Sequence, residues 1–364
     1  MKARIAVAVS AVIGLLSACG SSGDVSSHSP QASAGATPTA TAVRWPSSIE
    51  PRVPLGAVGD LAIGPRAVYA LFTPPGTEGG LEGAANVTVA RLDRASGTVL
   101  KAGPFPGALR LAFGAGSVWI GGGNYAGATP DPGAIGIVRL DPTTLQVMTK
   151  AALPAEARQR ALVAALVASS DHVWLAYGAH IYLLDSKTAT VRKKQSLNGF
   201  AASVAYDSRA GRLYVGTDAA DTQTQAMISE WDPATLHEVA SAVTGGTSLG
   251  GPEVAAAGTD VWVAFATGML GQVEHRRAAD LTVVKAATGH YTNSVRVFLA
   301  NRFVWTTDAM AGRLACLDPQ TGAVLASTAL DLGGVVAGDS SGLFVGDING
   351  VDALVPDPAC RQHA

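Results

Sequence analysis

The segment SVWIGG at residues 117–122 identifies the fold, because it is one copy of a motif that recurs along the chain. Each copy is a short apolar segment built around an aromatic residue, and successive aromatic residues are 39 to 55 positions apart. These aromatic residues are Tyr69, Trp119, Trp174, Tyr214, Trp262, Trp305 and Phe344. Seven units of roughly 45 residues, each with room for four short strands, are typical of the blades of a β-propeller.

A turn follows each copy at a regular distance, as in VRLDPTTL at residues 138–145. The aspartates that begin these turns are Asp93, Asp141, Asp185, Asp232, Asp318 and Asp357. In the fifth unit the equivalent place falls in HRRAADL, around Arg276, and this aspartate is absent. An aspartate at the first position of a turn accepts hydrogen bonds from backbone amides, and a following proline fixes φ. We therefore interpret the repeated Asp-Pro pairs as turn signals and not as catalytic carboxylates.

The second unit shows how the four strands divide, with strands a, b, c and d at residues 109–114, 117–122, 135–141 and 145–153. We predict an all-β protein in which residues 46–364 form a seven-bladed propeller of four-stranded blades. The seventh unit lacks its outer strand. The segment IEPRVPLG at residues 49–56 precedes the first unit, and we expect it to pair with the last blade, which closes the ring and removes exposed sheet edges.

On these aromatic segments and turns, the chain resembles the bacterial seven-bladed propellers of the YVTN and quinoprotein amine dehydrogenase-like superfamily. That superfamily includes dehydrogenase subunits, lyases and members that only bind. The resemblance therefore implies the fold and leaves the activity open.

The N-terminus has the layout of an export signal: Lys2 and Arg4 precede an apolar run at residues 5–16. The run is too short to span a bilayer as a helix. It ends in LSACG, which resembles the bacterial lipobox, so we expect residues 1–18 to be a lipoprotein signal peptide and Cys19 to be lipidated. Residues 19–45, rich in Ser, Ala, Thr and Pro, would then tether the propeller to the extracytoplasmic side of the cell membrane.

Composition excludes two classes of protein. The chain of 364 residues is 48% hydrophobic and 15% charged, which excludes a wholly disordered chain, and 26 basic against 28 acidic residues disfavour a nucleic-acid binder. Histidines do not occur at metal-ligand spacing, and the sequence holds no CxxCH, GxGxxG or P-loop motif. We therefore predict no cofactor and no metal.

Charged residues recur at the start of strand a, beside the expected central channel, at Asp60, Arg110, Glu253 and Arg296. They would form either a binding ring at the channel mouth or a self-neutralising cluster of ion pairs that only hydrates the channel. The b–c and d–a connections emerge on this same face and include the longest loops, which are common binding elements. Further candidates for contact there are Asn124, Tyr125, Arg158, Arg160, Asp218, Asp221, His290, Tyr291 and Asn293.

Two cysteines remain once Cys19 is assigned to the lipid. Cys316 lies in strand c of the sixth unit and Cys360 follows strand c of the seventh. In an oxidising compartment they would form either a disulfide that pins the C-terminal segment to the sixth blade or two separate buried thiols.

From these features we predict a membrane-anchored extracytoplasmic binding or scaffold module whose partner is an envelope protein or a small ligand. One alternative is a lyase or hydrolase with a divalent metal at the central channel, using His290 as a base near Glu253 and Asp60. Another is a cofactor-free subunit of an envelope redox complex.

Overall fold

The computed structural model describes residues 53–76, 86–122, 136–152, 163–218, 225–244, 251–287, 289–330, 334–340, 342–354, 356 and 358–360. The chain divides into the units Met1–Thr41 and Ala42–Ala364, and all described residues belong to the second unit.

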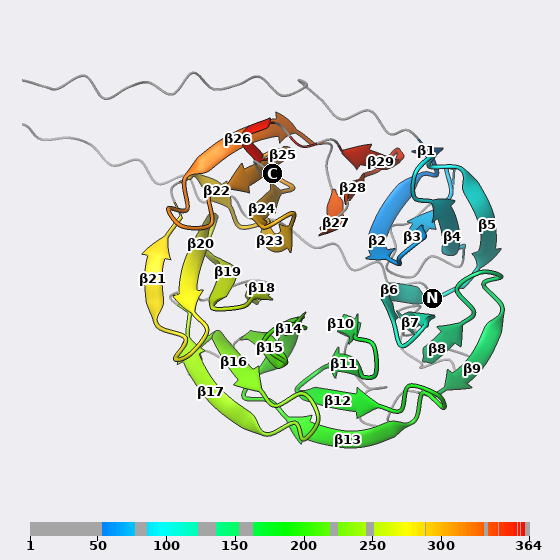
Figure 1. The fold of residues 1–364 in the computed structure, drawn as a ribbon, viewed down its shortest axis with the longest axis horizontal. Helices are drawn as coiled ribbons and strands as arrows, with labels where there is room; N and C mark the ends of the chain where they lie inside the picture. Colours follow the sequence, from blue (N-terminus) through cyan, green and yellow to red (C-terminus); the bar gives the residue numbers. More distant parts are fainter. Residues whose placement is uncertain are drawn as a thin grey trace, which may run out of the picture. The chain divides into compact units, whose positions relative to one another are not determined.

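The second unit is a seven-bladed β-propeller, as predicted (Figure 1). Each blade is an antiparallel sheet whose first strand lies innermost and whose last strand lies on the perimeter. Blade 1 comprises β2 (Ala57–Ile63), β3 (Ala67–Thr73), β4 (Thr88–Asp93) and β5 (Val99–Pro104). Blade 2 comprises β6 (Ala108–Gly114), β7 (Ser117–Gly122), β8 (Ile137–Leu140) and β9 (Val147–Ala151). Blade 3 comprises β10 (Val163–Ala168), β11 (Val173–Tyr177), β12 (His180–Leu184) and β13 (Val191–Ser196).

The remaining blades repeat this order. Blade 4 comprises β14 (Phe200–Asp207), β15 (Arg212–Asp218), β16 (Met227–Trp231) and β17 (Glu238–Val243). Blade 5 comprises β18 (Glu253–Ala257), β19 (Asp260–Thr267), β20 (Leu270–Arg277) and β21 (Val283–Ala286), with the short β22 (Tyr291–Thr292) paired to β20. Blade 6 comprises β23 (Val295–Ala300), β24 (Phe303–Asp308), β25 (Arg313–Leu317) and β26 (Val324–Ala329).

Blade 7 is closed by the two ends of the propeller chain, as predicted. Its strands β27 (Val335–Asp339), β28 (Gly342–Gly346) and β29 (Gly350–Leu354) come from the C-terminal part of the chain. The N-terminal β1 (Val53–Pro54) is the fourth strand and pairs antiparallel with β29, Val53 opposite Val351. The ring is therefore held by backbone pairing between segments about 300 residues apart in sequence.

Strand alternation gives the propeller two distinct faces. Because successive strands within a blade are antiparallel, the a–b and c–d turns lie at one end of the blades and the b–c and d–a connections lie at the other. We call these the a–b face and the b–c face.

The repeated aromatic residues fill the core between blades. All seven are buried, with Phe344 the most exposed at 6%. The Tyr69 hydroxyl donates a 2.8 Å hydrogen bond to the carbonyl of Pro142, and the Trp174 indole donates one of 2.8 Å to that of Pro233. In both cases the acceptor belongs to the c–d turn of the next blade, so these aromatic side chains couple neighbouring blades.

In the five c–d turns whose aspartate is described, that aspartate accepts hydrogen bonds from backbone amides of its own turn, as predicted, and Asp357 lies outside the described residues. In Asp141, for example, Oδ1 accepts hydrogen bonds from the Thr143 and Thr144 backbone amides and from the Thr144 hydroxyl. These bonds hold the pKa of the Asp141 carboxyl below its ordinary value. The residue four positions after the aspartate takes a left-handed conformation, and this is Leu145 in blade 2 and Leu236 in blade 4. Both leucines are buried, so the packing of their side chains holds the backbone in a conformation that usually favours glycine.

In blade 5 the residue equivalent to this aspartate is Arg277, one position beyond the expected Arg276. Its backbone makes the same two turn bonds, with Thr282 and Leu281. Arg276 is instead buried and pairs with Glu274 at 2.7 Å. The capping role is taken by Asp280, whose Oδ1 accepts from the amide and hydroxyl of Thr282.

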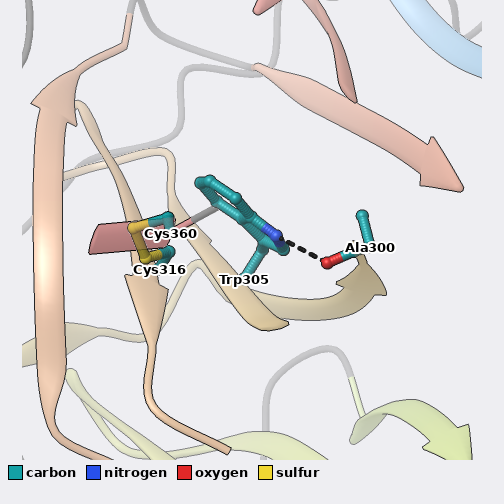
Figure 2. Close-up of a disulfide and its surroundings, with 4 residues drawn as sticks. All are labelled: Ala300, Trp305, Cys316 and Cys360. Atoms are coloured by element: carbon teal, nitrogen blue, oxygen red, sulfur yellow. Dashed lines mark hydrogen bonds between the residues drawn. A yellow bond between two sulfur atoms is a disulfide. The ribbon is translucent and has the colours of Figure 1, made fainter. Parts of the chain in front are cut away.

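A disulfide joins Cys316 of β25 to Cys360 of the 3₁₀ turn η2 (Pro358–Cys360), with Cα atoms 6.4 Å apart (Figure 2). Both cysteines are fully buried, beside the Trp305 indole, which donates to the Ala300 carbonyl. The disulfide therefore fixes the end of the described chain against blade 6.

Candidate functional site

The four charged residues expected at the channel mouth all lie on inner strands near the b–c face: Asp60 on β2, Arg110 on β6, Glu253 on β18 and Arg296 on β23. The Arg296 guanidinium lies 3.9 Å from the Glu253 carboxylate, and the two side chains are 55% and 35% exposed. This pair partly satisfies the self-neutralising interpretation. Because both groups remain open to water, either group can leave its partner and pair with a ligand at a small cost in free energy.

Asp60 joins two blades. Its Oδ1 accepts from its neighbour Leu61 at 2.9 Å, and its Oδ2 accepts from the Leu111 amide of blade 2 at 2.7 Å. Burial raises the pKa of the Asp60 carboxyl, although the nearby Arg110 guanidinium and these two amides act in the opposite direction. Asp60 is therefore a structural link between the first two blades as much as a candidate for contact with a ligand.

Six predicted residues lie outside the described residues: Cys19, Asn124, Tyr125, Arg158, Arg160 and Asp221. Asp218 is the last residue of β15, is partly exposed, and lies opposite Phe200, the first residue of β14. This places Asp218 on the b–c face, as expected.

The d–a connection into blade 6 is built as an extra strand. Strand β22 pairs with β20, with Tyr291 opposite Gly271 and Thr292 opposite Leu270. Tyr291, expected as a surface contact, is only 4% exposed, and its ring lies under the Arg313 guanidinium at 5.1 Å. The Arg313 side chain also donates a 2.7 Å hydrogen bond to the backbone carbonyl of His290, which is an exposed residue.

A buried carboxylate holds this connection in place. Asp308 is 1% exposed, and its Oδ2 accepts a hydrogen bond from the Thr292 amide at 2.7 Å. Its Oδ1 accepts from the Thr292 and Ser294 hydroxyls and from the Ala311 amide. Burial alone would raise the pKa of the Asp308 carboxyl, but the hydrogen bonds prevail and hold it below its ordinary value. The charged carboxylate thus fixes the d–a connection and the b–c turn of blade 6 against each other.

This fixed loop lies between two exposed methionines that the sequence analysis missed. The Asn293 amide nitrogen lies 3.8 Å from the Met269 sulfur, and the Met310 backbone amide donates to the Ser294 hydroxyl at 2.8 Å. Met269 occupies the b–c turn of blade 5 and is 66% exposed, and Met310 occupies that of blade 6 and is 57% exposed.

The methionines belong to a larger group of exposed apolar side chains. Among the described residues, the large apolar side chains that are exposed fall into two sets. Ten lie on the outer strands of the blades. The other five lie on the b–c face of four consecutive blades, and we call them the apolar patch: Phe200, Met269, Leu270, Met310 and Ile348. Apolar residues at the tips of turns, where polar residues usually stand, were the sequence signal for this patch.

Within the described ranges, no group of three or more His, Cys, Asp or Glu side chains has an arrangement that could hold a metal ion. In the same ranges, no helix has the length and apolar character needed to cross a membrane.

No protein-family model matches this chain, and no curated protein matches it. Among solved structures, the chain is similar to the crystal structure of BamB from Moraxella catarrhalis. The identity is 13%, the TM-score is 0.48, and the similarity covers 81% of this chain and 82% of that chain.

Proposed function

We propose that this propeller is an extracytoplasmic binding or scaffold module, anchored to the membrane by lipid at Cys19, and that its partner is an envelope protein that docks on the b–c face. The apolar patch is the observation that carries this proposal. Water-exposed Met and Leu side chains at 57–68% exposure are costly to leave uncovered and are typical of protein interaction surfaces.

The surroundings of the patch have the composition of an interface. The partly exposed ion pair between Glu253 and Arg296 lies on the inner strands of blades 5 and 6, the two blades that carry the exposed methionines. This pair supplies polar groups for the interface. The loop between the methionines is held by Asp308 before any partner binds, so little conformational entropy is lost on association. Methionine also adapts its shape to the surface that covers it.

The test is site-specific photocrosslinking of the anchored protein in its own membranes. A photoreactive residue at position 269 or 310 should capture one protein in high yield, whereas the same residue at Val147 should not. Val147 is the matched control, because it is apolar and 55% exposed but lies on the outer strand of blade 2.

A double variant, Met269→Gln with Met310→Gln, separates binding from labelling. It should weaken co-purification of the captured protein at least tenfold without lowering Tm. Crosslinks that form equally at position 147, or crosslinks only to lipid at positions 269 and 310, would refute the proposed protein partner.

A further inference from the structure

Charge is distributed unevenly around the ring. Residues 53–196, which include blades 1 to 3, contain 13 basic and 9 acidic residues. Residues 197–364, which include the other strands of the ring except β1, contain 9 basic and 17 acidic residues. One side of the propeller is therefore positive, although the whole chain carries a formal charge of −2.

The positive excess is concentrated on the outer strands of blades 1 to 3. Strands β5, β9 and β13 contain no acidic residue, and Figure 1 shows them in succession along the perimeter. The outer strands of blades 4 to 6 together contain one basic residue, Lys285, and one acidic residue, Glu238. The basic residues of β5, β9 and β13 are all exposed: Lys101, Lys150, Arg192, Lys193 and Lys194.

Blades 2 and 3 carry most of these cations on one surface. Successive side chains of a strand point in opposite directions. All six residues of β13 are nevertheless exposed, because β13 is the last strand of its sheet. The Thr149 hydroxyl of β9 and the Arg139 guanidinium of β8 donate to the backbone carbonyl of Lys187 in the c–d turn of blade 3, at 3.1 and 3.3 Å. We call the surface formed by β9, Lys187 and β13 the basic rim.

The carboxylates closest to the basic rim lie in c–d turns. Asp141, Asp185 and Asp232 each accept hydrogen bonds from the amides of their own turns. These bonds are the main reason why the pKa of the Asp185 carboxyl is below its ordinary value, and the charge of Arg192 acts in the same direction. Even with Asp232 of blade 4 counted, the described residues of blades 2 and 3 contain seven basic against four acidic residues. The basic rim therefore keeps a net positive charge.

Exposed apolar side chains accompany the cations. Val147, Met148 and Val191 are 55%, 50% and 41% exposed on β9 and β13. The two large cavities that we find are lined by residues between 206 and 360 and do not reach this surface. Cations mixed with apolar side chains, without a pocket, fit an extended anionic surface. The interface of a membrane is such a surface, because its phosphates attract lysine while apolar side chains and lysine stems enter the headgroup region.

Protection of the sheet edge explains only part of this pattern. Charged residues, and lysine above all, keep an exposed edge strand from pairing with another chain. Strand β26 is also the last strand of its blade, yet it contains no charged residue. Three consecutive cations on β13 therefore exceed what edge protection requires in this fold.

We propose that the basic rim binds the anionic headgroups of the membrane, so that blades 2 and 3 rest on the lipid surface. The net negative charge of residues 197–364 would be repelled from the same surface, and the uneven charge would thus orient the propeller. Contact through the perimeter leaves the b–c face uncovered. The inference rests on the proposed membrane location and does not depend on a partner at the b–c face.

The test uses the full-length protein reconstituted in vesicles that contain no other protein. An environment-sensitive fluorophore is attached through Met148→Cys, and spin-labelled phospholipid quenches it on contact. We expect quenching in vesicles of phosphatidylcholine with phosphatidylglycerol, little quenching in phosphatidylcholine alone, and loss of quenching in high salt. Lys193→Glu with Lys194→Glu should lower the ratio of rim-bound to detached protein at least 25-fold, since each cation near an anionic surface contributes about fivefold.

Matched controls separate membrane contact from other roles of the lysines. Glutamate also protects a sheet edge, so the double variant should stay monomeric with an unchanged Tm. Lys285→Glu changes an exposed lysine on the outer strand of blade 5 and should leave the quenching at position 148 unchanged. A fluorophore attached through Val284→Cys, on the same strand, should not be quenched.

Three results would overturn the proposal: equal quenching at positions 148 and 284, equal quenching in the two kinds of vesicle, or full quenching in the double variant. Binding of a DNA oligonucleotide without quenching in anionic vesicles would assign the cations to a soluble polyanion and would overturn it as well. Sedimentation with phosphatidylcholine vesicles measures anchoring by itself, so failure of the proposed anchor is distinguished from failure of the rim to bind lipid.

Discussion

Replacing Asp308 by Asn should loosen the loop that supports the apolar patch. The carboxylate uses both oxygens: Oδ2 accepts from the Thr292 amide, and Oδ1 accepts from the Ala311 amide and two hydroxyls. The side-chain amide of asparagine has only one oxygen. In either orientation of the substituted side chain, its NH₂ group faces a backbone N–H, and that buried donor loses its acceptor.

The magnitude follows from this geometry. An unsatisfied buried N–H costs about 1–3 kcal/mol, and the remaining bonds lose the assistance of the charge. We expect the free energy of unfolding to fall by about 2–4 kcal/mol. With an unfolding entropy of ~2.1 cal/mol/K per residue over roughly 300 residues, Tm should fall by about 3–6 °C.

The assay is calorimetry combined with the crosslinking yield at position 310, which should fall because Asp308 fixes the Ser294 hydroxyl that accepts from the backbone amide of position 310. Asp347→Asn is the matched control. Asp347 is also buried, at 2%, but the Asn349 and Gly350 amides both donate to its Oδ1, so one amide oxygen can replace the carboxylate. Its cost should stay under about 1 kcal/mol. If both variants shift Tm equally, the two-oxygen reasoning is wrong.

Three further predictions concern stability. Reducing the disulfide, or replacing Cys316 and Cys360 by Ser, should lower the free energy of unfolding by about 4 kcal/mol, because the two cysteines are 44 residues apart in sequence. A urea midpoint that reductant does not change would contradict this. Leu236→Gly relieves a left-handed φ of 53° but removes a side chain that is 3% exposed. Since the lost packing, about 2–5 kcal/mol, exceeds the relief of about 1–2 kcal/mol, urea denaturation should show net destabilisation. The pKa values of Asp308 and of the capping aspartates are lower in the folded state than the ordinary 3.8. The ionised carboxylates therefore stabilise the fold above that pH, and this stabilisation should be lost as the pH falls below it. A series of Tm measurements from pH 5 to 2 tests this, and a Tm that rises on acidification would contradict it.

The sequence was sufficient for the blades because each blade repeats the same local chemistry. The predicted strand at residues 117–122 coincides with β7, and the expected closing segment contains β1. The fifth c–d turn shows the limit of prediction from repeats. Two adjacent arginines give no sign of which begins the turn, and only the burial of Arg276 against Glu274 decides it.

The candidate site was harder to predict, because its residues are brought together by pairing between distant segments. From the sequence, Tyr291 is a loop residue. In the structure, β22 pairs with β20 and the Tyr291 ring is buried. Sequence patterns favoured long polar loops, whereas four of the five residues of the apolar patch lie in or beside short b–c turns such as Thr267–Leu270.

Ring closure by β1 has a mechanical consequence. A force applied to the chain that precedes β1 would reach blade 7 through the pairing of β1 with β29, which among the described residues comprises Val53 with Val351 and Pro54 with Gly350. Blade 7 would therefore lose its outer strand before any other blade yields. The covalent link at Cys360 restrains the opposite end of that blade's chain, so β27 to β29 would remain in register while β1 detaches and returns. The short fourth strand would then be the first part of the ring closure to open under load, while the other three strands of blade 7 stay paired.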